Sequence, residues 1–177
     1  YQASARTNAS NRDDERFFSR ALVRRLPAVL ALDAASTATG VATRFKGLAP
    51  GIRAAQVYEG GRQRNDYFLA VFGQSERKTV CVDEESREPA FAQALHLMNG
   101  ETVLRKVATS PVLDTLLQSR APRDEIVTEL YLRTLGRPPS AEELKSIAQL
   151  CGAQPLRRDY EHLWWALFNS TEFLFQH

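Results

Sequence analysis

Apolar residues recur at three- and four-residue intervals along most of the chain, a pattern typical of helices with one buried face. The first such segment spans residues 13–26, with aspartates at its start and arginines near its end, as the helix dipole favours. Its apolar stripe consists of Phe17, Phe18, Ala21 and Leu22. Pro27 suits the first turn of a second helix, and Gly40 can end that helix in the left-handed conformation. The pattern therefore predicts two successive helices.

The helical period disappears between residues 41 and 61, where glycine and proline punctuate the chain. Within this stretch, residues 52–58 have the character of an extended segment. A helix is predicted again over residues 65–73, and the pattern at 77–83 predicts a short strand. Irregular segments held on a rigid scaffold often carry functional residues, so we expect any site to involve residues 44–88.

Helix start and stop signals are dense in the C-terminal half. A helix predicted over residues 89–100 is followed by Ser110 and Pro111, which have the order of a helix cap and a first-turn proline. Another helix is predicted to begin after Pro122, with acidic residues in its first turn, and to end at Gly136.

Ser140 and Glu143 have the spacing of a capping box, and Gly152 can end the helix that this box begins. A last helix is predicted over residues 159–175. Short helices that turn back on one another predict a mainly α fold, a compact multi-helix bundle with a loop-rich, slightly extended central segment. We expect a single α-helical domain over residues 1–177.

Composition and charge narrow the choice of partners. With 177 residues, 44% of them hydrophobic, the chain has enough apolar side chains for a sizeable core. A net charge of +2, with acidic and basic residues interleaved, argues against nucleic acid as a partner. No apolar run is long enough to span a membrane, and the first residues lack the apolar core of a signal peptide. Because the chain opens at Tyr1 rather than at methionine, we expect a fragment of a longer protein.

Four separated strings occur in an order that carries a resemblance. They are "NRDDERFFSRALVRRLPAVLALDAASTATG", "NDYFLAVFG", "EPAFAQALHLMNGETV" and "ELYLRTLGRPPSAEEL…LWWALFNSTEFLFQH". In these strings the chain resembles the C-terminal domain of unknown function of planctomycete cytochrome-c-associated multidomain proteins, over nearly its whole length. The resemblance implies an exported protein, periplasmic or extracellular, whose upstream domains are partners of this one. It places any haem in an upstream domain, since this chain lacks the Cys-x-x-Cys-His attachment sequence.

The chain departs from its relatives at one notable motif. Where they commonly have Cys-x-Cys-Glu-Arg, this chain has "CVDEE", so that Cys81 and Glu84 match while Asp83 and Glu85 replace the second cysteine and the arginine. This departure argues against dithiol or two-sulfur metal chemistry. With Cys151 far away in the sequence, two separate thiols are favoured over a disulfide.

Several polar groups are candidates for chemistry, each with a structural alternative. The acidic residues beside Cys81 could hold a hard cation, but they lack the ligand spacing of a calcium loop, and an acidic loop before a helix start is favoured. Gln93, His96 and Asn99 lie at three-residue spacing, so that they fall near one helical face. A histidine can act as acid, base or ligand, yet no nucleophile can be assigned to it, and a structural role is favoured.

We therefore assign no catalytic, cofactor-binding or metal-ligating residue. The remaining polar candidates for a site are Cys81, Glu84, Gln93, His96 and Asn99. Trp164 and Trp165 are adjacent and cannot share one helix face, so one can anchor the core and the other a contact with an upstream domain or a protein partner, although packing within the domain is favoured for both.

Two further motifs, a glycosylation pattern and a set of arginines, also have structural explanations. The glycosylation pattern at Asn8 and Asn169 is common by chance, and helix-end capping explains Asn169. Surface ion pairs are expected, rather than an anion site, for the arginines Arg24, Arg25, Arg157 and Arg158.

Two functions agree with the sequence. The first, which we favour, is a non-catalytic C-terminal structural or interaction module of an exported multidomain protein. The resemblance links such a protein to polysaccharide processing. The alternative is a contribution to a redox or hydrolytic enzyme site that upstream domains complete. A cleft that gathers Cys81, Glu84, Gln93 and His96 would favour the alternative.

Overall fold

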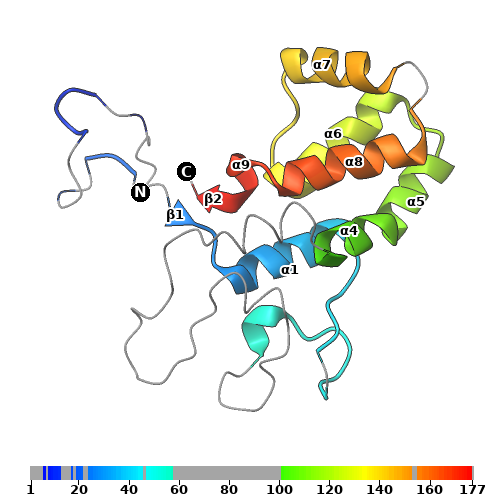
Figure 1. The fold of residues 1–177 in the computed structure, drawn as a ribbon, viewed down its shortest axis with the longest axis horizontal. Coiled ribbons are helices and arrows are strands. Elements are labelled where there is room, and N and C mark those ends of the chain that lie inside the picture. The colour runs from blue at the N-terminus through cyan, green and yellow to red at the C-terminus, as the bar shows by residue number, and fades with distance from the viewer. Residues whose placement is uncertain are drawn as a thin grey trace.

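The computed structural model describes residues 6, 8–12, 17, 19–21, 24–45, 47–57, 101–152 and 155–176. The chain is mainly helical, which confirms the predicted fold class (Figure 1). Its elements are β1 (Arg24–Arg25), α1 (Ala28–Thr39), the 3₁₀ helix η1 (Ala54–Gln56), α4 (Glu101–Ala108), α5 (Pro111–Gln118), α6 (Arg123–Leu135), α7 (Ala141–Cys151), α8 (Arg157–Phe168), α9 (Thr171–Leu174) and β2 (Phe175–Gln176). The predicted elements at 65–73, 77–83 and 89–100 lie outside the described residues.

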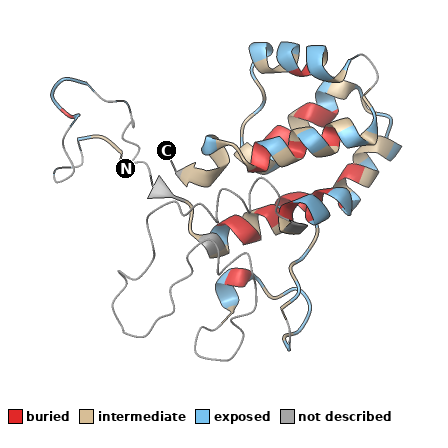
Figure 2. Ribbon diagram, viewed as in Figure 1, coloured by how far each residue is buried: buried red, intermediate tan, exposed pale blue. Residues whose placement is uncertain are grey.

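The core lies where α1, α4, α6 and α8 meet. Helix α1 contacts α4 and α6, and α8 contacts the same two helices. Figure 2 shows buried residues along these four helices, whereas α7 is largely exposed. The largest fully buried apolar side chains are Trp164, Phe168, Leu32, Leu113 and Leu130. Each such side chain contributes about 1.5–3 kcal/mol when it leaves water, so this interior is the main source of stability.

The end of α1 is joined to the start of α5 by buried polar contacts. Gly40 ends α1 with a φ of 71°, and a Cβ at this position would lie 3.2 Å from Val112 Cγ2. The buried hydroxyl of Ser110 donates to Thr39 O at 2.6 Å and accepts from Leu113 N at 3.3 Å. Lys106 Nζ donates to Val41 O at 2.7 Å. The bonds to Thr39 O and Val41 O satisfy carbonyl groups at the end of α1 and just beyond it, and the bond from Leu113 N satisfies an amide at the start of α5.

Local capping signals correctly predict where the C-terminal helices begin and end. Ser110 caps α5, with Pro111 in its first turn, and Gly136 ends α6 with a φ of 72°. At α7, Ser140 Oγ accepts from Glu143 N at 3.2 Å, and Glu143 Oε2 accepts from Ser140 N at 2.6 Å. The predicted capping box is therefore confirmed, as is the end of α7 at Gly152.

The predicted helix over residues 13–26 is wrong at its C-terminal end. Arg24 and Arg25 form β1, which pairs antiparallel with β2, and Leu26 N donates to Leu174 O at 2.7 Å. Leu26 precedes Pro27, and the proline ring disfavours helical backbone at the preceding residue. Helix α1 accordingly begins one residue after the proline.

Two further predictions need correction. Residues 52–58 were expected to be extended, but η1 forms at Ala54–Gln56 because Asp33 of α1 accepts bonds from two of its backbone N–H groups. The last predicted helix is two helices, since Ser170 caps a new helix by accepting from Phe173 N at 3.2 Å. Within the described ranges, no helix is both long enough and apolar enough to cross a membrane.

Candidate functional site

A pocket of about 210 Å³ lies between α1 and the irregular segment that follows it. We call it the α1 pocket; its lining residues are Asp33, Ser36, Thr37, Gly40, Ala42, Thr43, Gly51, Ile52 and Arg53. The segment over residues 41–53 supplies one wall, so the pocket overlaps the region in which a site was expected. Helix α1 supplies the other wall, which the sequence did not single out.

Asp33 fixes the shape of this pocket. Its Oδ1 accepts from Ala54 N at 2.7 Å, and its Oδ2 accepts from Ala55 N at 3.0 Å. The carboxylate thereby caps the start of η1 from a neighbouring helix, because the first N–H groups of a helical turn have no partner within the turn. This contact holds the chain around Arg53 against α1.

The contacts of Ser36 and Thr43, which both line the pocket, determine whether each hydroxyl group donates or accepts hydrogen bonds. Ser36 Oγ donates to Leu32 O at 2.7 Å, so its single proton is already engaged. Ser36 and Thr43 are joined by a hydroxyl–hydroxyl contact of 3.1 Å, in which Thr43 must then be the donor. Both hydroxyl oxygens therefore offer lone pairs, rather than protons, to a molecule in the pocket.

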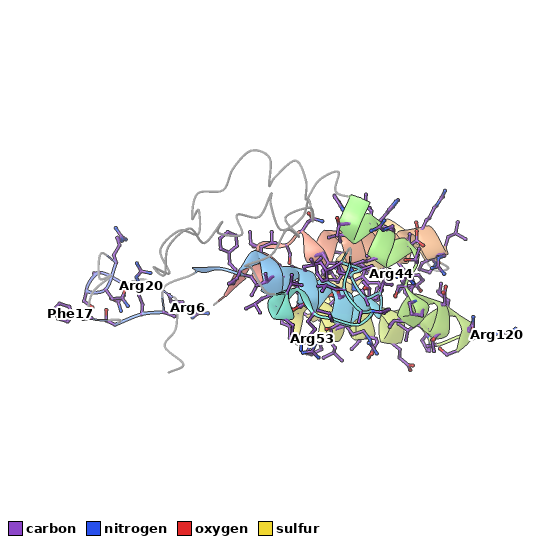
Figure 3. The ribbon with its side chains drawn as sticks, turned by 90° about the horizontal axis from the view of Figure 1, so that it is seen from below. Arg6, Phe17, Arg20, Arg44, Arg53 and Arg120 are labelled. Atoms are coloured by element: carbon purple, nitrogen blue, oxygen red, sulfur yellow. The ribbon has the colours of Figure 1, made fainter. Side chains whose placement is uncertain are left out.

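Two opposite charges line the α1 pocket without pairing. Within the described part of the chain, no ion pair joins Asp33 to Arg53, and neither residue pairs with another charged side chain. Arg53 is exposed, and Figure 3 shows it on the part of the molecule formed by the helices. The pocket thus offers a carboxylate, hydroxyl lone pairs and a guanidinium.

A second group of polar side chains connects the loop after α6 with α7 and α9. This Arg137 cluster comprises Arg137, Tyr131, Glu143 and Glu172. The guanidinium donates to both oxygens of Glu143 at 2.9 Å and to both oxygens of Glu172 at 2.6 and 2.7 Å, and it lies 5.6 Å from the centre of the Tyr131 ring. With a further bond from Nη1 to Pro138 O at 3.1 Å, all five N–H groups of the guanidinium are directed at neighbours in the fold.

The charges of this cluster perturb one another. Hydrogen bonds from Arg137 and from the Ser140 backbone lower the pKa of Glu143 to about 2, and the two carboxylates raise the pKa of Arg137. Burial, and then the charge of Glu143, raises the pKa of Tyr131. The shifts of Glu143 and Arg137 both favour the charged forms that the ion pairs need, so the cluster holds these elements together.

Cys81, Glu84, Gln93, His96 and Asn99 lie outside the described residues, so the proposed cleft among them stays a prediction. Cys151 is a free, half-buried thiol, and burial followed by the charge of Asp159 raises its pKa. In the portion that the structure describes, no three histidine, cysteine or acidic residues gather as a metal site would require.

The tryptophans and Asn169 pack within the domain, as favoured. Trp164 is fully buried and donates from Nε1 to Thr134 Oγ1 at 2.8 Å, while Trp165 packs against the same core. Asn169 ends α8, and its Nδ2 donates to Trp165 O at 2.7 Å.

Of the four arginines expected to form surface ion pairs, Arg157 and Arg158 do so on α8, while the side chains of Arg24 and Arg25 lie outside the described ones. Arg157 pairs with Asp114 of α5 and, at 2.7 Å, with Glu161. Arg158 lies 3.9 Å from Asp159. The first of these pairs joins two helices, and the others lie within α8.

Sequence reasoning missed Asp33 and Arg137. Arg137 stands in "GRPPS", directly before the capping box, and a guanidinium beside a predicted carboxylate cap was a usable signal. Glu172 lies 35 residues further along, and no local pattern links it to Arg137. Asp33 looked like one polar position on an amphipathic helix, since its partners lie 21 and 22 residues away.

One of three comparisons with known proteins identifies a family for this chain. Neither curated proteins nor solved structures include a match. A family model described as "PSD1: Protein of unknown function (DUF1553)" matches residues 1–151, which cover β1, α1, η1 and the helices from α4 to α7. The chain therefore belongs to this family of proteins of unknown function.

Proposed function

We propose that this chain is a non-catalytic C-terminal structural and interaction module of an exported multidomain protein of the planctomycete cytochrome-c-associated type. In this proposal the whole protein is periplasmic or extracellular, carries haem in an upstream domain and takes part in polysaccharide processing. The resemblance of the four ordered strings supports this assignment. The domain binds the upstream domains of its own polypeptide, or a protein partner.

The observation that carries the proposal is a contrast between two kinds of side chain. Several charged side chains are bonded within the domain, whereas some large apolar side chains are exposed. Arg137, Arg157 and Lys106 each bond groups on other elements of the fold. Leu150 and Leu156, in contrast, keep 85% and 58% of their surface exposed where α7 leads into α8. A contiguous exposed apolar surface is typical of a site that a partner covers, and the proposal takes these two leucines as members of such a surface.

Helix α7 is the proposed contact element. Its inner side is held by the buried Ile147 and by the Arg137 cluster, so these contacts order the helix before any partner binds. A surface that is already ordered loses little conformational freedom on binding. The apolar Leu150 then provides contact area on a rigid support.

Isolation of the native protein tests the proposal. An antibody raised against this chain would capture the polypeptide from its source, followed by intact mass measurement and a haem absorption spectrum. We expect a mass well above the 19.9 kDa of this chain, together with covalently bound haem. A haem-free polypeptide near that mass would overturn the proposal.

The interaction role has a separate readout. Lys145 is exposed on α7 and accepts an amine-reactive cross-linker. Mass spectrometry of the cross-linked native protein should find Lys145 joined to an upstream domain or a partner protein. Cross-links confined to this chain would contradict the role of α7.

A composite enzyme site is the second candidate function, and the α1 pocket is the observation that favours it. The pocket lies beside the irregular region and contains a carboxylate with lone pairs available. Substitution of Cys81, Glu84 or His96 in the full polypeptide distinguishes the candidates. A composite site requires a large loss of turnover with intact folding, whereas a non-catalytic module predicts unchanged turnover.

A further inference from the structure

The α1 pocket holds opposite charges that no described side chain neutralises. Asp33 and Arg53 line the same small cavity, yet no ion pair joins them. We propose that the α1 pocket binds a small zwitterion, with the ammonium group of the ligand at Asp33 and its carboxylate at Arg53. A free amino acid is the simplest molecule of this kind.

The Asp33 side of the pocket suits an ammonium group. Each carboxylate oxygen accepts one backbone N–H, and a carboxylate oxygen can accept two bonds, so one position on each oxygen is left. Ser36 and Thr43 also present lone pairs, because their protons are engaged within the protein. An ammonium has three protons to donate and no lone pair, and it therefore matches a wall made of acceptors.

The Arg53 side suits a carboxylate. A guanidinium donates two parallel bonds to a carboxylate, and the fork geometry favours this group over a neutral oxygen. Thr37 lines the same cavity, and within the described residues its hydroxyl has no hydrogen-bond partner. It can supply a further donor. The two charged groups thus give the ligand one orientation, with its ammonium at Asp33 and its carboxylate at Arg53.

The size of the pocket limits the ligand. Its volume of about 210 Å³ is below the ~300 Å³ at which pockets for drug-sized molecules begin. No aromatic ring is among the described residues that line it, so a stacked base or sugar ring would find no platform. Gly51 leaves the rim open, since a Cβ there would have no neighbour within 4 Å.

Ligand-observed NMR on the folded chain tests the proposal, with the twenty standard L-amino acids as probes. We expect saturation transfer to at least one of them. Its N-acetyl derivative, which lacks the ammonium, and its methyl ester, which lacks the carboxylate, should each bind about tenfold more weakly or not at all, because each loses a charged hydrogen bond. A complete absence of transfer, or equal binding of the methyl ester, would overturn the proposal.

Matched variants locate the binding. Arg53→Gln removes an exposed charge and should lower the affinity for the amino acid about tenfold. Arg158→Gln removes an exposed arginine of α8 and should leave the affinity unchanged. Asp33→Asn should also abolish binding, with circular dichroism showing that the helices persist. Equal affinity in Arg53→Gln and the unsubstituted protein would show that the ligand lies elsewhere. The native mass and haem content do not affect this result, so the pocket and the multidomain proposal can fail separately.

Discussion

The interior between α1, α4, α6 and α8 and the corner formed by α7 are stabilised by different kinds of contact. In the interior, Trp164 and Leu130 are completely buried, and the Trp164 indole is the donor of one neutral hydrogen bond. At the corner, Arg137 joins α7 and α9 through two carboxylates that remain about one third exposed. An apolar side chain stabilises the fold most when it is completely removed from water. An ion pair that water can reach is screened and stabilises the fold less.

This difference separates stability from surface function. The interior should determine whether the chain folds, and the corner should determine where α7 stands. A contact surface on α7 can therefore change without loss of the core. This separation implies that substitutions cost less stability from the interior outward.

Trp164→Ala should have the largest effect. Removal of a fully buried indole leaves a cavity among tightly packed side chains, and the free energy of unfolding should fall by about 3–5 kcal/mol. Chemical denaturation monitored by circular dichroism measures this free energy. Trp164→Phe is the matched control, since it removes the hydrogen bond to Thr134 but keeps most of the volume; it should cost about 1 kcal/mol. Equal losses in both variants would mean that the hydrogen bond, rather than packing, dominates.

Ser110→Ala should come next, with a loss of about 2 kcal/mol. The substitution removes the cap of α5 and leaves the buried carbonyl of Thr39 without its donor. Thermal unfolding gives the change. Thr109→Ala, at an exposed hydroxyl one residue earlier, should alter stability much less. A neutral Ser110→Ala would show that this junction contributes little.

Arg137→Gln should destabilise by about 1 kcal/mol, because its partners are partly exposed and solvent screens the ion pairs. The variant leaves Glu143 and Glu172 close together without a cation between them. Arg133→Gln removes a single exposed pair with Glu129 and should cost less, about 0.3–0.5 kcal/mol. Equal losses in Arg137→Gln and Arg133→Gln would show that the cluster contributes nothing beyond one surface pair.

Glu143 should make the corner sensitive to acid. Its pKa is about 2 in the folded chain and 4.5 ordinarily, so the folded state holds the carboxylate charged where the unfolded state takes up a proton. The stabilisation is therefore complete above about pH 4.5 and is lost as the pH falls towards about 2. Denaturation of the unsubstituted protein and Glu143→Gln across this interval measures it. The difference between them should shrink on acidification; a constant difference would contradict the assignment.

Leu150→Ser should have the smallest effect on folding, within about 0.5 kcal/mol, since this side chain is 85% exposed. Ile147→Ala on the same helix is the buried control and should cost about 2–5 kcal/mol. Thermal unfolding of both variants provides the comparison. A large loss in Leu150→Ser would place that residue in the core rather than on a contact surface.

The sequence predicts those parts of the fold that depend on neighbours three or four residues apart. The Ser140–Glu143 box, the Ser110 cap and the glycine ends at Gly136 and Gly152 form as expected, because each is complete within one turn. The prediction was wrong at Arg24–Arg25, where a partner at the other end of the chain overrides the helical pattern.

The candidate site was less predictable for the same reason. Irregular backbone after α1 suggested one wall of the α1 pocket, but Asp33 becomes significant only when η1 folds back onto α1. Arg137 likewise acquires its second carboxylate from α9. A hydrophobic pattern specifies which face of a helix is buried, but it does not specify which distant segment will meet the polar face.

The pairing of β1 with β2 has a consequence for the order in which the chain folds. These strands join residues near opposite ends of the sequence through only a few backbone contacts. Closing so long a loop costs entropy that two residue pairs cannot offset until the intervening helices have already assembled. The pairing should therefore form late and open early, and its amide hydrogens should exchange with solvent faster than those of α6 or α8.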